Sequence, residues 1–137
     1  MKRPILSRRA GGFTLVELVV AVAIIGVLSA IAVPSYMSYT ERTHRSAAKA
    51  ILVETAQFME RHYTNNNTYV GGALVSAVSP KGATGSAVRY NITFSAGPAA
   101  STFTLQAAPA GRQTSDECGT MTLSNTGAQT AAVAGCW

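Results

Sequence analysis

Two cysteines and two histidines are the side chains in this sequence that most readily take part in covalent or metal chemistry. Cys118 and Cys136 allow a single intramolecular bridge, and neither belongs to a CxxC pair or to a Cys/His cluster of the kind that binds zinc. His44 and His62 would lie about 27 Å apart on one helix, so they do not share a metal ion. We therefore expect one disulfide or two free thiols, depending on the compartment, and neither a metal site nor a cofactor.

No group of residues has the composition and spacing of a catalytic site. The polar run of Ser115, Asp116 and Glu117 has no histidine beside it in the sequence, and no Gly-rich phosphate-binding loop occurs. The sequence therefore predicts a protein that is not an enzyme and has no catalytic residues.

Glu17 is the one charged residue in an apolar run that continues to Val33. Acidic residues are rare in membrane-spanning segments, and those that occur there usually have a function. A simpler explanation is that an acid in the first turn of a helix interacts favourably with the helix dipole. Both explanations of Glu17 remain open from the residues alone.

The positive charge of the chain is concentrated before this run. The net charge is +5, and four cations lie within the first nine residues, namely Lys2, Arg3, Arg8 and Arg9. Residues 13–137 hold seven Lys and Arg against six Asp and Glu. The C-terminal body offers only Lys81, Arg89 and Arg112 against Asp116 and Glu117. Nucleic-acid binding by the body is therefore possible but unsupported by its charge.

The composition excludes two classes of protein. Charged residues make up 12% of the chain and hydrophobic residues 47%, whereas disordered chains are rich in charge and poor in apolar residues. Only one run approaches the roughly 20 apolar residues that a helix needs to cross a bilayer, so a polytopic membrane protein is excluded as well.

Residues 13–63 predict one long helix, because Pro34 is the only strong helix stop among them. Residues 13–36 are apolar on all sides and need lipid or other helices around them. Residues 37–63 are amphipathic. At 1.5 Å per residue the helix would be about 75 Å long, so we expect its first half to protrude from the folded body. Pro34 and the weak helix former Gly26 should bend it.

Residues 64–137 predict a small body with a surface loop and an antiparallel sheet. The loop covers the Gly-rich residues 71–87. Three runs then alternate apolar and polar side chains, with Val88, Tyr90, Ile92 and Phe94, then Phe103, Leu105 and Ala107, then Met121 and Leu123 as apolar members. The apolar stripe of the helix, expected to cover this sheet, consists of Ala48, Ile51, Leu52, Thr55, Phe58, Met59 and Tyr63. The predicted fold class is α+β.

Residues 12–17, with the sequence GFTLVE before the long apolar run, resemble the class III signal of type IV prepilins and pseudopilins. The resemblance to the type IV pilin family, and within it to PilE-like minor pilins, implies that a prepilin peptidase removes the basic leader 1–12. The peptidase would cut after Gly12 and methylate the new terminal amine of Phe13. The resemblance also implies that Glu17 sets the register of a filament by pairing with the Phe13 amine of a neighbouring subunit.

Ordinary signal-peptidase cleavage is the competing explanation, because Ala30, Ile31 and Ala32 form a small-residue cleavage pattern. In the pilin interpretation, the four N-terminal cations keep the N-terminus cytoplasmic by the positive-inside rule. The body would then emerge in a bacterial periplasm, an oxidising compartment where Cys118 and Cys136 can pair. In family terms these cysteines bound the D-region, and the bridge is worth roughly 3 kcal/mol.

The leading functional hypothesis is a structural subunit of type IV pili. It would be a single-pass inner-membrane protein first and part of an extracellular pilus later, polymerised with other pilin subunits through their N-terminal helices. One alternative is a pilin-like receptor for DNA uptake. Another is a type II secretion pseudopilin, a class that resembles pilins but usually uses calcium where this chain has two cysteines. A simple membrane anchor would also explain the apolar run.

Overall fold

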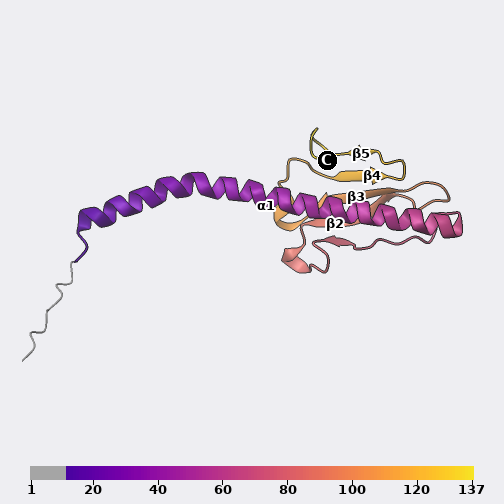
Figure 1. The fold of residues 1–137 in the computed structure, drawn as a ribbon, viewed down its shortest axis with the longest axis horizontal. Helices are drawn as coiled ribbons and strands as arrows, with labels where there is room; N and C mark the ends of the chain where they lie inside the picture. The colour runs from indigo at the N-terminus through magenta and orange to yellow at the C-terminus, as the bar shows by residue number, and fades with distance from the viewer. Residues whose placement is uncertain (1–11) are drawn as a thin grey trace, which may run out of the picture. The chain divides into compact units, whose positions relative to one another are not determined.

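The computed structural model describes residues 12–137, and most of the basic leader, residues 1–11, lies outside the described part. The described chain contains the long helix α1 (Leu15–Asn66), the short 3-10 helices η1 (Gly85–Ala87) and η2 (Gly111–Gln113), and five strands. The strands are β1 (Val78–Ser79), β2 (Tyr90–Ala96), β3 (Thr104–Pro109), β4 (Met121–Ser124) and β5 (Gln129–Thr130) (Figure 1). The chain divides into two compact units, Met1–Met37 and Ser38–Trp137, and α1 contributes to both.

A side-chain cap begins α1, and a left-handed residue ends it. At the start, the Thr14 hydroxyl accepts a hydrogen bond from the backbone N–H of Glu17 at 3.2 Å, which is the usual bond of an N-cap residue. At the end, Asn67 adopts a left-handed conformation with φ of 55°, and its N–H bonds to the carbonyl of Tyr63 at 2.7 Å. The helix therefore ends three residues later than position 63. Thr64 bonds back to the carbonyl of Glu60 at 2.9 Å and remains helical.

Gly26 and Pro34 both lie inside α1, which continues without interruption through them. A Pro removes one helical hydrogen bond, and a Gly weakens the helix through its backbone entropy. The helix nevertheless persists through a sequence made mostly of Val, Ile, Leu and Ala. The bend at these two positions stays a prediction.

The sheet has five antiparallel strands in the order β1-β2-β3-β4-β5 (Figure 1). The β2–β3 register places Ile92 opposite Ala107, and the β3–β4 register places Leu105 opposite Leu123. The three predicted strands are confirmed as the centre of this sheet. The edge strands β1 and β5, of two residues each, are additions that the sequence pattern does not predict, because alternation cannot be recognised over two residues.

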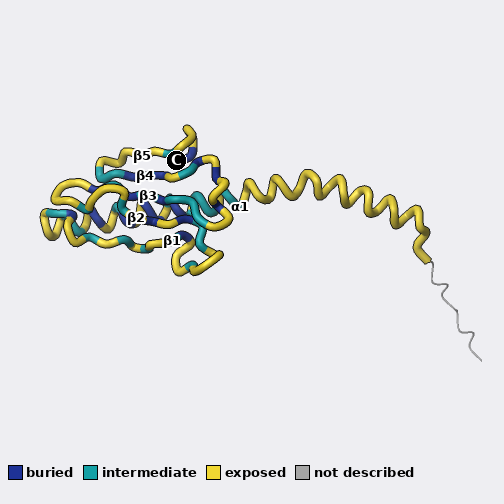
Figure 2. Tube along the Cα trace, turned by 180° about the vertical axis from the view of Figure 1, so that it is seen from behind, coloured by how far each residue is buried: buried dark blue, intermediate teal, exposed yellow. Residues whose placement is uncertain are grey.

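The core of the second unit lies between one face of α1 and one face of the sheet, which Figure 2 shows as a line of buried residues. The helix contributes Ala48, Ile51, Leu52, Thr55 and Met59. The sheet and its flanking residues contribute Tyr90, Ile92, Phe103, Leu105, Ala107, Met121 and Leu123. The predicted α+β class, with the helix packed on an antiparallel sheet, is confirmed. Of the two candidates for the stripe at one turn, Phe58 and Met59, Met59 takes the core position and Phe58 is exposed.

Candidate functional sites: the N-terminal helix and the disulfide-bounded segment

The described residues of the first unit are exposed and almost entirely apolar (Figure 2). The largest exposed side chains are Phe13, Leu15, Val16, Leu18, Val19, Val20, Val22, Ile24, Ile25, Val27, Leu28, Ile31, Val33, Tyr36 and Met37. Within residues 12–137, α1 is the one helix long and apolar enough to cross a membrane by length and composition. A soluble chain rarely leaves so large an apolar surface uncovered, so it marks an interaction with lipid or with other helices.

The predicted processing and assembly residues lie together at the start of this unit. Gly12 and Phe13 precede α1, and Phe13 is 77% exposed. Glu17 lies exposed in the first turn of the helix, where its charge is also favourable for the helix dipole. Cleavage after Gly12, methylation of Phe13 and pairing of Glu17 stay predictions.

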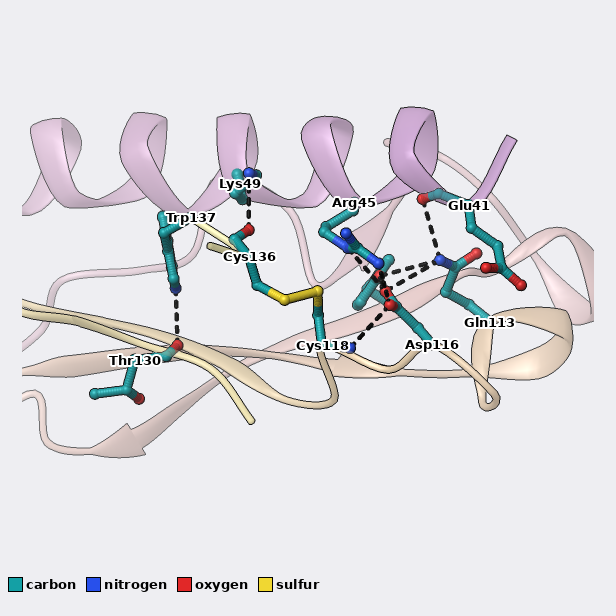
Figure 3. The surroundings of a disulfide bond; sticks show 10 residues. Glu41, Arg45, Lys49, Gln113, Asp116, Cys118, Thr130, Cys136 and Trp137 are labelled. Atoms are coloured by element: carbon teal, nitrogen blue, oxygen red, sulfur yellow. Dashed lines mark hydrogen bonds and ion pairs between the residues drawn. A yellow bond between two sulfur atoms is a disulfide. The ribbon is translucent and has the colours of Figure 1, made fainter. Parts of the chain in front are cut away.

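A disulfide joins Cys118 to Cys136, as Figure 3 shows, with the two Cα atoms 5.7 Å apart. Both cysteines are buried. The bridge encloses β4 and β5 and bounds the segment that the family resemblance assigns to the D-region. The predicted pairing is confirmed.

Beside Cys118 lies a polar cluster that the sequence does not reveal, formed by Arg45, Tyr90, Gln113 and Asp116 and called the Asp116 cluster below (Figure 3). The guanidinium of Arg45 donates two hydrogen bonds to the Asp116 carboxylate, one of them from Nε at 3.2 Å. The Tyr90 hydroxyl donates to Oδ2, and Gln113 Nε2 lies 3.2 Å from the same oxygen. Oδ1 accepts the backbone N–H of Cys118 at 3.1 Å.

The charge of the Asp116 cluster is stabilised by these donors. Burial alone would raise the pKa of the Asp116 carboxyl, but the hydrogen bonds from Arg45, Tyr90, Cys118 and Gln113 outweigh it and lower the pKa from 3.8 to about 2. The pKa of Arg45 is raised, mainly by its hydrogen bond to Asp116. The pKa of Tyr90 is also raised, first by burial and then by its bond to Asp116. Asp116 therefore stays ionised and Tyr90 stays protonated at neutral pH.

The polar run of residues 115–117 is divided between solvent and the interior. Ser115 and Glu117 are exposed, whereas the Asp116 side chain has no exposed surface. Arg45 lies 71 residues earlier in the chain, and no local pattern connects the two. The cluster is an ion-pair network that holds a loop, and nothing in its geometry provides a nucleophile and base facing an open cavity.

Cations gather at a second place, around η1 and η2, which lie side by side. The guanidinium of Arg89 donates to the carbonyl of Ser86 at 2.8 Å and lies next to Gly111, the residue before the exposed Arg112. The pKa of His44 on α1 is lowered by burial and by the nearby charge of Arg89. His44 is therefore mainly uncharged at neutral pH and adds no positive charge to Arg89 and Arg112.

Two residues in the charge count of the body are paired with residues of α1. The acid Asp116 is neutralised by Arg45, and the cation Lys81 pairs with Glu54 in an exposed ion pair. Within residues 12–137, no three His, Cys, Asp or Glu side chains lie close enough together to hold a metal ion.

Two family descriptions match the sequence. Residues 34–122 match "Type IV minor pilin ComP, DNA uptake sequence receptor". Residues 7–33 match "Prokaryotic N-terminal methylation motif". Together they cover the apolar helix and most of the body.

Similar proteins of known name and structure are pilins. The chain is 35% identical over 71 residues to the type IV wide pilus major component PilA4 of Thermus thermophilus, covering 50% of this chain and 54% of that protein. It is 36% identical over 76 residues to the type IV major pilin protein PilE of Neisseria gonorrhoeae, covering 51% and 46%. The chain spans about half the length of the curated relatives it matches.

Two solved structures share the fold over most of their length. A type IV pilin from Shewanella oneidensis is 30% identical, with a TM-score of 0.56, and the match covers 71% of this chain and 97% of that one. The non-core minor pilin PilV of Neisseria meningitidis is 25% identical, also with a TM-score of 0.56, covering 72% and 92%.

Proposed function

The chain belongs to the type IV pilin family, in the minor pilin group whose description matches residues 34–122, and on that premise we propose that it is a structural subunit of a type IV pilus. One observation carries the proposal: the exposed apolar first part of α1 lies mostly within residues 7–33, which match the N-terminal methylation motif. Such a surface needs lipid before assembly and neighbouring helices after it. The family consists of structural subunits, so the protein is not an enzyme.

In this proposal the chain consists of four segments with different roles. Residues 1–12 are a leader that prepilin peptidase removes after Gly12, leaving a methylated Phe13. Residues 13–36 cross the inner membrane and later pack in the filament core. Residues 37–63 hold the sheet, and residues 64–137 form the periplasmic body. The buried disulfide supports that location, since disulfides persist in oxidising compartments.

Glu17 would have a different role before and after assembly. In the membrane it lies near the end of the apolar segment, where the cost of a charge is below that at the bilayer centre. Among packed apolar helices the carboxylate needs a cation, because an unpaired buried charge is costly. The Phe13 amine of a neighbouring subunit supplies it once cleavage after Gly12 has occurred. Apolar packing alone would not define the axial register of the helices.

The test replaces Glu17 with Val in cells that assemble pili. We expect Glu17→Val to insert, to be cut after Gly12, and to be missing from sheared filaments, as measured by intact mass of the membrane and filament fractions. Thr14→Val is the matched control, because it removes the N-cap hydrogen bond to Glu17 but keeps the charge. It should enter filaments. Wild-type incorporation of Glu17→Val would contradict the pairing and leave Glu17 as a helix-terminus residue.

A second candidate function is DNA binding during uptake, which the matched family description names. The observation in its favour is that the Arg89 guanidinium lies beside Gly111, the residue before the exposed Arg112, where η1 and η2 meet. Positive side chains that converge on one surface attract the phosphates of a nucleic acid and make the affinity salt-dependent.

DNA binding is tested with the full chain in detergent and a labelled duplex at several salt concentrations. Changing both Arg89 and Arg112 to Ala should weaken binding and reduce the slope of log K against log salt by about 1 per cation removed. Arg61→Ala is the control, because Arg61 is an exposed cation about 26 Å along α1 from His44. If Arg61→Ala weakened binding as much per cation as the double variant does, only the total charge would matter. The surface at Arg89 and Arg112 would then not be the binding site.

A further inference from the structure

Three residues on one stripe of α1 hold the C-terminal segment, defined here as residues 113–137. The carbonyl of Glu41 accepts a hydrogen bond from Gln113 Nε2 at 3.2 Å, and one turn later Arg45 binds Asp116. After another turn, Lys49 Nζ donates to the carbonyl of Cys136 at 2.9 Å. Residues four apart lie on the same face of a helix, so the three contacts follow one line, as Figure 3 shows.

The end of this segment near Cys118 is held strongly and without the disulfide. The Asp116 side chain has no exposed surface and that of Arg45 is 12% exposed, so their ion pair is shielded from water and from salt. Tyr90 and Gln113 add donors from the sheet and from η2. The bond from the Cys118 N–H to Asp116 closes a turn of the kind in which an Asp side chain fixes the backbone two residues later.

Apart from the disulfide, the end near Cys136 has few polar contacts, and its side chains Ala131 and Trp137 pack against the core while only partly buried. Lys49 provides one hydrogen bond to Cys136, and the N–H of Ala132 donates to the carbonyl of Cys118 at 3.0 Å. The indole of Trp137 donates to the carbonyl of Thr130 at 2.8 Å, which is a bond within the same segment. Residues 132–135 are exposed, and Val133 leaves 48% of its surface to solvent.

We propose that the Cys118–Cys136 disulfide is a redox-sensitive latch with two unequal ends. Reduction by a dithiol releases residues 131–137 from α1, while residues 113–118 stay bound through the Asp116 cluster. In the reaction the S–S bond breaks, each sulfur gains a proton and an electron to become a thiol, and the dithiol is oxidised to a disulfide. The released end uncovers Trp137 and leaves the Lys49 ammonium without its carbonyl acceptor.

Only one end is released because the contacts at the Cys118 end are stronger than those at the Cys136 end. The Asp116 cluster combines a buried ion pair with several donors, and opening it would leave a buried charge without a partner. The other end loses little when Lys49 exchanges one partly exposed hydrogen bond for water. Without the bridge, the conformational entropy gained by residues 131–137 outweighs the Lys49 hydrogen bond and the partial burial of Ala131 and Trp137.

The experiment uses the full chain in a non-denaturing detergent, with and without dithiothreitol. Trp137 is the single tryptophan of the sequence, so its emission and its quenching by acrylamide report only on the Cys136 end. Hydrogen exchange measures both ends at once. We expect red-shifted, more easily quenched emission, and exchange about tenfold faster or more in residues 131–137. Exchange in residues 113–118 and the far-UV circular dichroism should stay unchanged, and reoxidation should restore all signals.

Loss of protection at both ends together, or at neither, would overturn the proposal. A variant with both cysteines changed to Ser should show the open pattern without reductant, and the wild-type experiment still decides if this variant does not fold. Lys49→Met with the bridge intact should leave the emission and the quenching of Trp137 as they are in the wild type. If Lys49→Met alone exposes Trp137, then the lysine and not the disulfide holds the Cys136 end, and this result contradicts the proposal.

Discussion

Asp116 is a fully buried acid whose five hydrogen-bonding contacts come from α1, the sheet, η2 and the next turn of its own loop. A buried carboxylate without such partners would be protonated or would unfold the loop. With these partners, Asp116 stays charged and binds the C-terminal segment to α1 through Arg45. Arg45 is the indispensable partner, because its removal would leave the charge uncompensated.

The pH dependence of stability follows from the lowered pKa of Asp116. A carboxyl with a folded-state pKa of about 2 and an ordinary value of 3.8 stabilises the fold above about pH 4 and loses that contribution as the pH falls towards 2. The expected loss in the free energy of unfolding is about 2 kcal/mol. Urea unfolding of the full chain in detergent, followed by Trp137 emission between pH 5 and pH 2, measures it.

Two variants separate this effect from general acid sensitivity. Asp116→Asn should be less stable at pH 5 and should lack this part of the pH dependence. Glu117→Gln changes the exposed neighbour and should keep the wild-type profile. A wild-type profile in Asp116→Asn would mean that another carboxyl causes the acid sensitivity.

At the scale of elements, the fit between the end of α1 and the loop after it depends on Gly72. The loop turns back there, with the N–H of Gly72 bonded to the carbonyl of Tyr69 at 2.9 Å. A Cβ at Gly72 would lie 2.4 Å from the sulfur of Met59 and 3.0 Å from the Tyr69 oxygen. Because Met59 is fully buried, its side chain has little room to move.

We expect Gly72→Ala to destabilise the second unit by about 1–3 kcal/mol, the usual cost of overpacking. Thermal unfolding measured by far-UV circular dichroism checks this. In a protein that already carries Met59→Ala, Gly72→Ala should reduce the free energy of unfolding by less than it does in the wild type. The reason is that the shortened side chain at position 59 no longer occupies the space of the new Cβ. Simple additivity of the two effects would contradict the contact as the cause.

At the scale of the whole molecule, the proposed periplasmic and filament locations make the cysteines a test of compartment. Both thiols are joined and buried, so neither reacts with an alkylating reagent while the bridge is intact. In intact cells we expect no labelling of the mature protein before reduction and labelling at two sites after reduction and unfolding, measured by mass spectrometry. Labelling of both cysteines without reduction would place the body in a reducing compartment.

Much of the architecture is determined by local sequence patterns. The run from Leu15 to Val33 is evident as a helix because it is apolar on all sides except for Glu17 and Ser29. Residues 48–59 show their buried stripe through spacing alone. The central strands β2, β3 and β4 are equally evident, since each alternates over at least four residues. The pairing of the only two cysteines requires no long-range information beyond the compartment.

The tertiary structure decided what depends on contacts between distant residues. Whether Asp116 is exposed or buried is set by Arg45 and Tyr90, and residue type alone favours the exposed state. Arg89 lies just before β2 and Arg112 lies in η2, 23 residues later, so the approach of the Arg89 guanidinium to η2 cannot be read along the chain. Periodicity reports which face an element buries, because that depends on neighbours three or four residues away. It does not report which side chains meet across the core, because that depends on how α1 and the sheet pack.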